Sequence, residues 1–184
     1  MELTPSLSVG TSLLRSARRL SRFTLLLAGL IPLFVLAQYL LVDAASIPAP
    51  FGMTALLTGL DWTLERRLLA ALVGLLPAAA IAYALVALSR ICHQYAEGRL
   101  FSDVVLGGYR RLGVALVVTT VLSWLQPTLF GLALALTLPP GKRFLTVGIS
   151  SNDLLLILLT ALVFLLGAVM QVAQRVQSEN AEIV

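Results

Sequence analysis

Four long runs of apolar residues constrain this chain more than any other feature. They cover about residues 23–42, 68–88, 112–138 and 154–172, and none of them contains Asp, Glu, Lys, Arg or His. A helix of about 20 apolar residues crosses the hydrocarbon core of a bilayer. A helix also satisfies its own backbone hydrogen bonds, which water cannot do inside a membrane. The sequence therefore predicts an all-α fold, an integral membrane bundle of four transmembrane helices.

The composition agrees with a membrane location. Of the 184 residues, 59% are hydrophobic and 12% are charged, whereas a soluble domain carries about 25% charged residues. A chain of this length is expected to form one domain, residues 1–184. The single cysteine, Cys92, excludes a disulfide within the chain.

The distribution of Lys and Arg predicts the orientation, because cytoplasmic segments carry an excess of positive side chains. With the N-terminus inside, nine of the thirteen fall on the inner side. These are Arg15, Arg18, Arg19, Arg22, Arg90, Arg99, Arg110, Arg111 and Arg175, against Arg66, Arg67, Lys142 and Arg143 outside. We therefore expect a multi-pass protein of the bacterial cytoplasmic (inner) membrane, N-in and C-in, with a cytoplasmic hairpin at about 90–111.

The four arginines near the N-terminus recur at helical spacing and form a basic face at the membrane surface. This face is interpreted as a topology anchor or, more specifically, as a contact for anionic lipid headgroups.

On the outer side, Arg66 and Arg67 depart from the charge rule, and pairing with Asp61 and Glu65 one turn earlier is expected to accommodate them. Residues 51–62 have roughly helical apolar spacing, which indicates either a short interfacial helix or a loop packed on the bundle.

Small residues predict how the helices pack. In the second run they recur every four residues, a pattern that lets another helix approach closely. They are Ala70, Gly74, Ala78 and Ala82, and they indicate an internal seam or a homodimer interface. The third run is longer than a bilayer needs, so it is tilted, or broken at Gln126-Pro127. Gln126 is interpreted as a polar contact between helices, or as the lining of a substrate pocket.

The segment between the second and third runs is the most polar internal part of the chain. Glu97-Gly98-Arg99 predicts a turn, and Ser102 or Asp103 can cap the helix that follows, because a short side-chain oxygen accepts from free N–H groups. Arg110 and Arg111 then anchor the third run.

Ion-coupled transport is disfavoured, because the apolar runs hold no ionisable residue. The sequence also has no metal-ligand spacing and no nucleophile with a placed base, so we expect no enzyme activity, no cofactor and no direct nucleic acid binding.

Two stretches resemble a known pattern. Residues Glu97–Ser102, followed by Arg110-Arg111-Leu112-Gly113, are similar to the central hairpin of a bacterial family of small four-helix membrane proteins of unknown function, the YoaS-like group. The tail from Gln177 to Val184 is similar to the family's short acidic C-terminal signature, with Ala181 in place of an acidic or polar residue. Such proteins are often encoded beside a small helix-turn-helix regulator of the Cro/CI type. The resemblance implies that the membrane protein holds or signals to a cytoplasmic DNA-binding partner.

Two functional hypotheses follow. The first is a membrane-embedded regulatory module that binds a small transcription regulator at its cytoplasmic face. Its candidate contact residues are Glu97, Gly98, Arg99, Phe101, Arg110, Arg111, Glu179 and Asn180. The alternative is a non-enzymatic transport or permeation component, alone or as a subunit of a larger membrane complex. Plain membrane anchoring explains each of the same residues more simply, and membrane lipid is an expected partner in every case.

Overall fold

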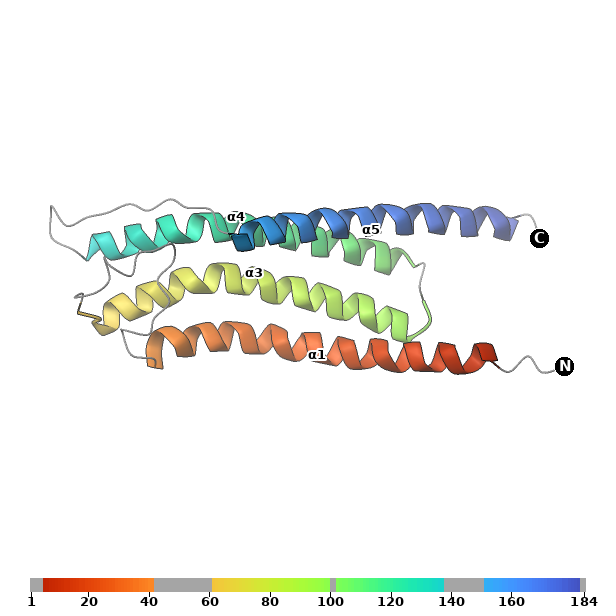
Figure 1. Ribbon diagram of the computed structural model, residues 1–184, viewed down its shortest axis with the longest axis horizontal. Coiled ribbons are helices and arrows are strands. Elements are labelled where there is room, and N and C mark those ends of the chain that lie inside the picture. Colours follow the sequence, from red (N-terminus) through yellow and green to blue (C-terminus); the bar gives the residue numbers. More distant parts are fainter. Residues whose placement is uncertain (1–4, 42–60, 100–101, 138–150, 183–184) are drawn as a thin grey trace.

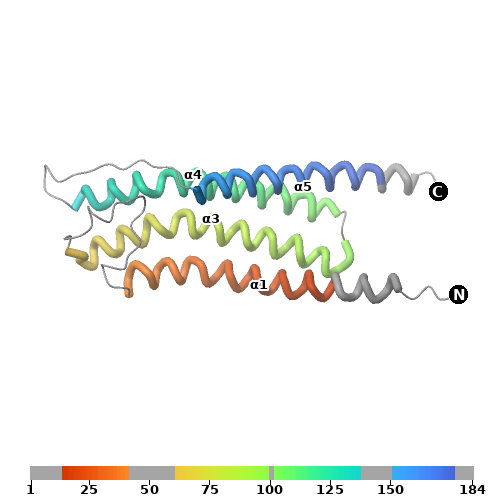
Figure 2. Tube along the Cα trace, viewed as in Figure 1, coloured from red at the N-terminus to blue at the C-terminus, as the bar shows by residue number. Residues whose placement is uncertain are grey.

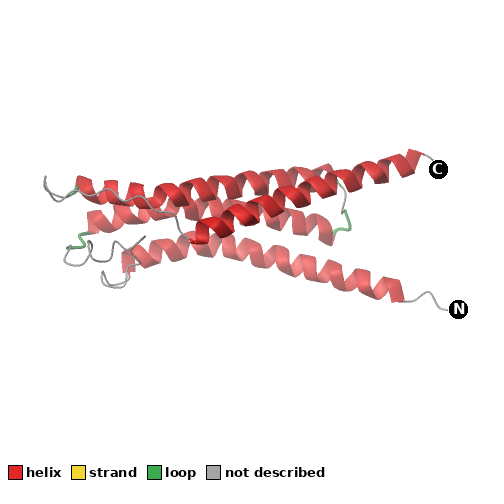
Figure 3. Cartoon of the chain, turned by 45° about the horizontal axis from the view of Figure 1, so that its top comes forward, coloured by secondary structure: helices red, strands yellow, loops and turns green. Residues whose placement is uncertain are grey.

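The computed structural model describes residues 5–41, 61–99, 102–137 and 151–182, with side chains for residues 14–41, 61–99, 102–137 and 151–176 (Figure 2). Its elements are the helices α1 (Pro5–Leu41), α3 (Leu64–Ala96), α4 (Asp103–Leu136) and α5 (Ser151–Glu182). Figure 3 shows the long segments of the chain as helices, and the described residues contain no strand. The predicted all-α fold is confirmed.

The helices are longer than the predicted apolar runs that they contain. α3 has 33 residues and α4 has 34, so each is about 50 Å long at a rise of 1.5 Å per residue, against about 30 Å of hydrocarbon. Among the described residues, four segments are long and apolar enough to cross a membrane: Leu14–Leu41, Leu64–Ala96, Asp103–Leu136 and Ser151–Val176. α4 is unbroken through Pro127, so the expected break at Gln126-Pro127 is absent. The connections 42–60 and 138–150 lie outside the described residues, and with them most of the predicted interfacial helix.

The helices run up and down in sequence order, and each packs mainly against the next one along the chain: α1 on α3, α3 on α4, α4 on α5. Figure 1 shows both termini at the same end as the α3–α4 turn. Within the apolar windows, 44% of the α3 residues and 39% of the α4 residues are buried, against 17% in α1 and 6% in α5. α3 and α4 therefore form the centre of an open row of helices. α1 and α5 lie at its two edges and expose most of their apolar side chains, which lipid can cover.

At each of the three interfaces between neighbouring helices, a side chain of one helix packs directly against a glycine of the other. A Cβ on Gly74 of α3 would lie 2.8 Å from Cε2 of Tyr39 on α1. A Cβ on Gly108 of α4 would lie 2.7 Å from Cγ1 of Ile91 on α3, and one on Gly113 would lie 2.8 Å from Cζ of Phe164 on α5. Because helices in lipid associate largely by close packing, these three contacts set the spacing of the row.

Arg66 and Arg67 donate hydrogen bonds to the ends of neighbouring helices, at the end of the row opposite the α3–α4 turn. Arg66 donates from Nε to Oγ1 of Thr137 at 3.0 Å and from Nη2 to the carbonyl oxygen of the same residue at 3.2 Å. Arg67 donates from Nη1 to the carbonyl oxygen of Leu40 at 3.3 Å. These carbonyls stand at the C-terminal ends of α4 and α1, where the helix dipole favours a cation. Arg66 contacts Asp61 through its carbonyl oxygen, at 2.6 Å, rather than through the expected carboxylate.

Candidate functional site at the α3–α4 turn

The turn between α3 and α4 ends α3 with a Schellman motif. The N–H of Arg99 donates to the carbonyl of Gln94 and the N–H of Gly98 to that of Tyr95, both at 3.1 Å. Gly98 has φ +78°, a left-handed conformation that glycine adopts without a steric penalty. The predicted turn is confirmed, and its shape is fixed by the backbone rather than by the charged residues on either side.

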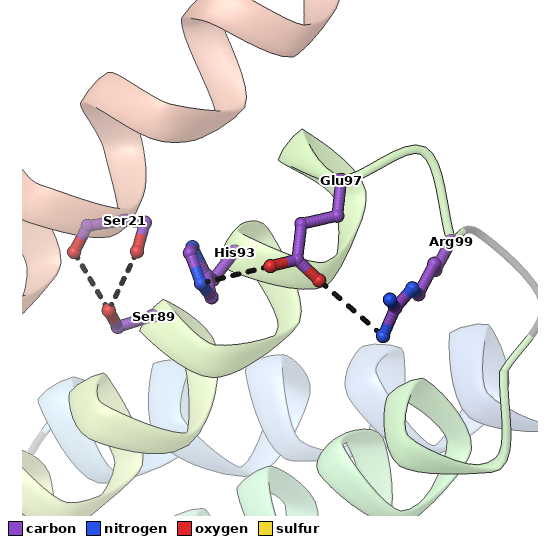
Figure 4. Close-up of polar contacts among 5 residues, drawn as sticks. All are labelled: Ser21, Ser89, His93, Glu97 and Arg99. Carbon is purple, nitrogen blue, oxygen red and sulfur yellow. Dashed lines mark hydrogen bonds and ion pairs between the residues drawn. The ribbon is translucent and has the colours of Figure 1, made fainter.

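Glu97 holds its carboxylate between two basic side chains of the turn (Figure 4). Oε1 lies 3.4 Å from Nε2 of His93, and Oε2 lies 3.7 Å from Nη1 of Arg99. The side chains of Glu97, His93 and Arg99 are 39%, 60% and 68% exposed. Exposed contacts between charged or polar side chains add little stability, so the three groups remain free to exchange their contacts for those of a charged partner.

The start of α4 is capped and is tied to α5. The Ser102 hydroxyl accepts from the N–H of Val105 at 3.4 Å, which confirms Ser102 as the N-cap. Asp103 follows in the first turn, where the helix dipole favours an anion. Its Oδ1 accepts from Nε2 of Gln174 on α5 at 3.0 Å. The turn is therefore connected to the last part of α5 as well as to the helices that it joins.

Two hydroxyl pairs hold α3 at this end of the row. The Tyr95 and Tyr109 hydroxyls lie 2.9 Å apart, joining α3 to α4. On the other side of α3, the Ser89 hydroxyl donates to the carbonyl oxygen of Ser21 on α1 at 2.8 Å. The two serine Oγ atoms are 3.0 Å apart, so the Ser21 hydroxyl is the donor in that second contact, since the hydrogen of Ser89 is already used. These hydrogen bonds, together with packing, fix the part of α3 that leads into the turn.

The predicted contact residues divide into three groups. Glu97, Gly98 and Arg99 lie together in the turn. Arg110 and Arg111 are both exposed on α4, but they line different hollows, Arg110 between α4 and α5 and Arg111 between α3 and α4. Phe101 lies outside the described residues. The backbone at positions 179 and 180 is helical, while the side chains of Glu179 and Asn180 lie outside the described part of the chain.

The predicted packing residues lie on α3 and α4. Ala70, Gly74 and Ala78 are buried by packing within the chain, and Ala82 is half-buried. Gln126 is half-buried in α4, and its amide has no hydrogen-bond partner among the residues that the structure describes. The sequence reasoning missed the Asp103–Gln174, Tyr95–Tyr109 and Ser21–Ser89 pairs. The available signal was their position, because each pair joins polar residues that follow or precede an apolar run at the same end of the molecule.

The described part of the site presents charged and polar side chains beside one another at the end of α3. Within the described ranges, no three His, Cys, Asp or Glu residues are placed to hold a metal ion. The turn instead offers a carboxylate, an imidazole and a guanidinium on a rigid backbone.

No curated protein and no solved structure matches the chain. One family model does match, over residues 26–184, which include the turn, both central helices and all of α5. The stretch that it leaves out contains the basic part of α1. By that match, the chain belongs to the family described as "Protein of unknown function (DUF2975)".

Proposed function

We propose that this multi-pass membrane protein is a non-enzymatic regulatory module, and that its α3–α4 turn binds a small DNA-binding regulator. The observation that carries the proposal is the Glu97–Arg99 turn, in which exposed charged groups stand on a backbone fixed by the Schellman motif. A fixed backbone with exposed charge favours binding, because less conformational freedom is lost when the partner docks.

The charge distribution supports a cytoplasmic location for the turn. Among the described residues, nine arginines lie at the end of the row that holds the turn, and two lie at the opposite end. Those two, Arg66 and Arg67, contact helix carbonyls, a role in the fold that accounts for their position at that end. With the positive end inside, the turn and both termini face the compartment in which a transcription regulator is found.

The nature of the partner follows from the resemblance of the hairpin to proteins encoded beside small helix-turn-helix regulators. A DNA-binding domain is generally basic on its DNA-binding face. The Glu97 carboxylate is the acidic group that the described turn presents to such a face, while Arg99 beside it can contact an acidic side chain of the partner. Binding at this site would hold the regulator at the membrane and away from DNA.

The test uses a charge exchange that leaves the net charge unchanged. The variant Glu97→Arg/Arg99→Glu keeps Gly98 and the positive-inside bias, so its insertion into the membrane is expected to be normal. The chain is purified in mild detergent from its native host, and a recovered regulator is then produced separately and titrated against the purified chain. We expect at least tenfold weaker binding by the exchange variant, which corresponds to about 1.4 kcal/mol.

The matched control is Arg18→Gln, which removes an exposed charge from α1 at the same end of the molecule. Its affinity for the regulator is expected to equal that of the unmodified chain. Equal binding by the exchange variant would show that the turn is not the contact surface. If no DNA-binding protein accompanies the unmodified chain, the proposed function is wrong.

A further inference from the structure

A groove runs along the contact between α4 and α5 and contains two hollows. The first has a volume of about 250 Å³ and lies toward the α3–α4 turn, with Tyr109, Arg110 and Gln171 among its lining residues. The second has a volume of about 340 Å³ and lies deeper along the helices, lined by residues that include Val117, Trp124 and Ile157. Phe164 lines both hollows. Its ring lies against Gly113 and marks the boundary between them.

The deeper hollow offers a hydrocarbon surface. Its two hydroxyl groups use their hydrogens within their own helices: Thr120 donates to the carbonyl of Leu116 at 2.9 Å, and Thr160 to that of Leu156 at 2.6 Å. Val117 and Trp124 are 43% and 40% exposed, so the hollow is open along its length. In a bilayer an opening of this kind is filled by lipid tails, which are as apolar as leucine.

The hollow near the turn is different, because it carries polar groups that remain available. Arg110 is exposed, and its guanidinium has no hydrogen-bond or ion-pair partner within the described part of the chain. The Gln171 amide is exposed opposite it on α5. The Tyr109 hydroxyl is already paired with Tyr95. A cation and an amide at the membrane surface, above an apolar groove, complement a phosphate group that is attached to an acyl chain.

The dimensions agree with one leaflet. Arg110 and Trp124 lie 14 residues apart on one helix, which is about 21 Å. Half of the hydrocarbon core is about 15 Å thick, and the headgroup region accounts for the rest. We propose that the α4–α5 groove binds an anionic phospholipid of the leaflet on the side of the turn, with its phosphate on Arg110 and Gln171 and an acyl chain extending past Phe164 to Trp124. This inference does not depend on the proposed regulator.

Trp124 provides a direct reporter. The chain has two tryptophans, so the Trp62→Phe variant leaves Trp124 as the single fluorophore. The full chain is reconstituted in phosphatidylcholine vesicles with a small fraction of phosphatidylglycerol brominated on its acyl chains. Parallel vesicles carry the same fraction of brominated phosphatidylcholine. Bromine quenches tryptophan only on close contact, so the ratio of the two quenching constants measures the preference of the groove for the anionic lipid.

We expect about a fivefold preference for phosphatidylglycerol, the effect of one basic side chain near an anionic headgroup. Arg110→Gln should abolish this preference and Arg110→Lys should retain most of it. The matched control is Arg111→Gln, which removes an exposed arginine from the α3–α4 side of the same helix and should leave the ratio unchanged. Ala161→Phe fills the deeper hollow and should reduce quenching by both lipids.

Three results would overturn the proposal. Equal quenching by the two lipids in the unmodified groove would show that it has no headgroup preference. An equal loss of preference in Arg110→Gln and Arg111→Gln would assign the effect to diffuse surface charge. Absence of quenching by either lipid, together with energy transfer between labelled chains, would show that a second copy of the chain covers the groove.

Discussion

Adjacent glycines near the start of α4 separate the effect of packing from that of helix propensity. A Cβ on Gly108 would lie 2.7 Å from Cγ1 of Ile91, whereas nothing lies within 4 Å of a Cβ on Gly107. Ile91 is only 2% exposed, so its side chain has little room to move away. Replacement by alanine gains about 1 kcal/mol of helix propensity at either position, and overpacking costs about 1–3 kcal/mol at Gly108 alone.

The propensity gain cancels when the two variants are compared, because both residues lie in the same part of one helix. We expect Gly107→Ala to be about 1–3 kcal/mol more stable than Gly108→Ala. The free energy of unfolding is measured in mild detergent by titration with sodium dodecyl sulfate, followed by far-ultraviolet circular dichroism. Shortening Ile91 removes the clashing atom, so Gly108→Ala should become neutral or stabilising in an Ile91→Ala background. Equal stability of the two glycine variants would refute the assigned close contact between α3 and α4.

Two further predictions concern helix ends. Gly98→Ala forces a β-carbon into the left-handed conformation at φ +78°, so it should cost about 1 kcal/mol; Gly29→Ala, which meets nothing within 4 Å, is the control in the same unfolding assay, and equal effects would contradict the turn geometry. Arg66→Ala removes the bonds to Thr137 and Asp61 and should cost about 1–3 kcal/mol, as expected for hydrogen bonds from a charged donor. Arg90→Ala, an exposed arginine on the same helix, should change the same unfolding free energy by less than about 0.5 kcal/mol, and a similar loss in both variants would argue against capping by Arg66.

The sequence predicted the helices well because the membrane restricts the alternatives. A long apolar run in lipid has to be helical, so the four runs indicated four helices, and the turn residues Gly98 and Ser102 marked where two of them meet. Hydropathy does not predict which helices pack against each other, because it measures how apolar a residue is and not the shape of its side chain. The open row of helices and the contact of Gly113 with Phe164 depend on side-chain shape, which a linear pattern does not specify.

Polar residues were harder to interpret than apolar ones. Arg66 was expected to pair with the carboxylate of Asp61 or Glu65, yet it bonds to the C-terminal end of α4, 71 residues away in sequence. The Asp103–Gln174 pair spans the same separation. Long-range polar contacts of this kind depend on which helix ends become neighbours, and a single sequence gives no information on that point. The charge rule still identified the positive end of the row, because it requires only the positions of the arginines along the chain.

The α4–α5 interface is the place where a change in the membrane could alter the turn with the least disruption of the fold. Only 6% of the apolar window of α5 is buried, against 44% for α3, so a shift of α5 breaks fewer contacts than a shift of either central helix. The groove that we assign to lipid lies in this interface, and the Asp103–Gln174 bond links the same two helices at the turn. A lipid can bias the turn only if it binds more tightly to one position of α5 than to another. The Asp103–Gln174 bond at the start of α4 is the contact that such a shift would strain first, because it is short and directional whereas the apolar contacts along the groove can slide.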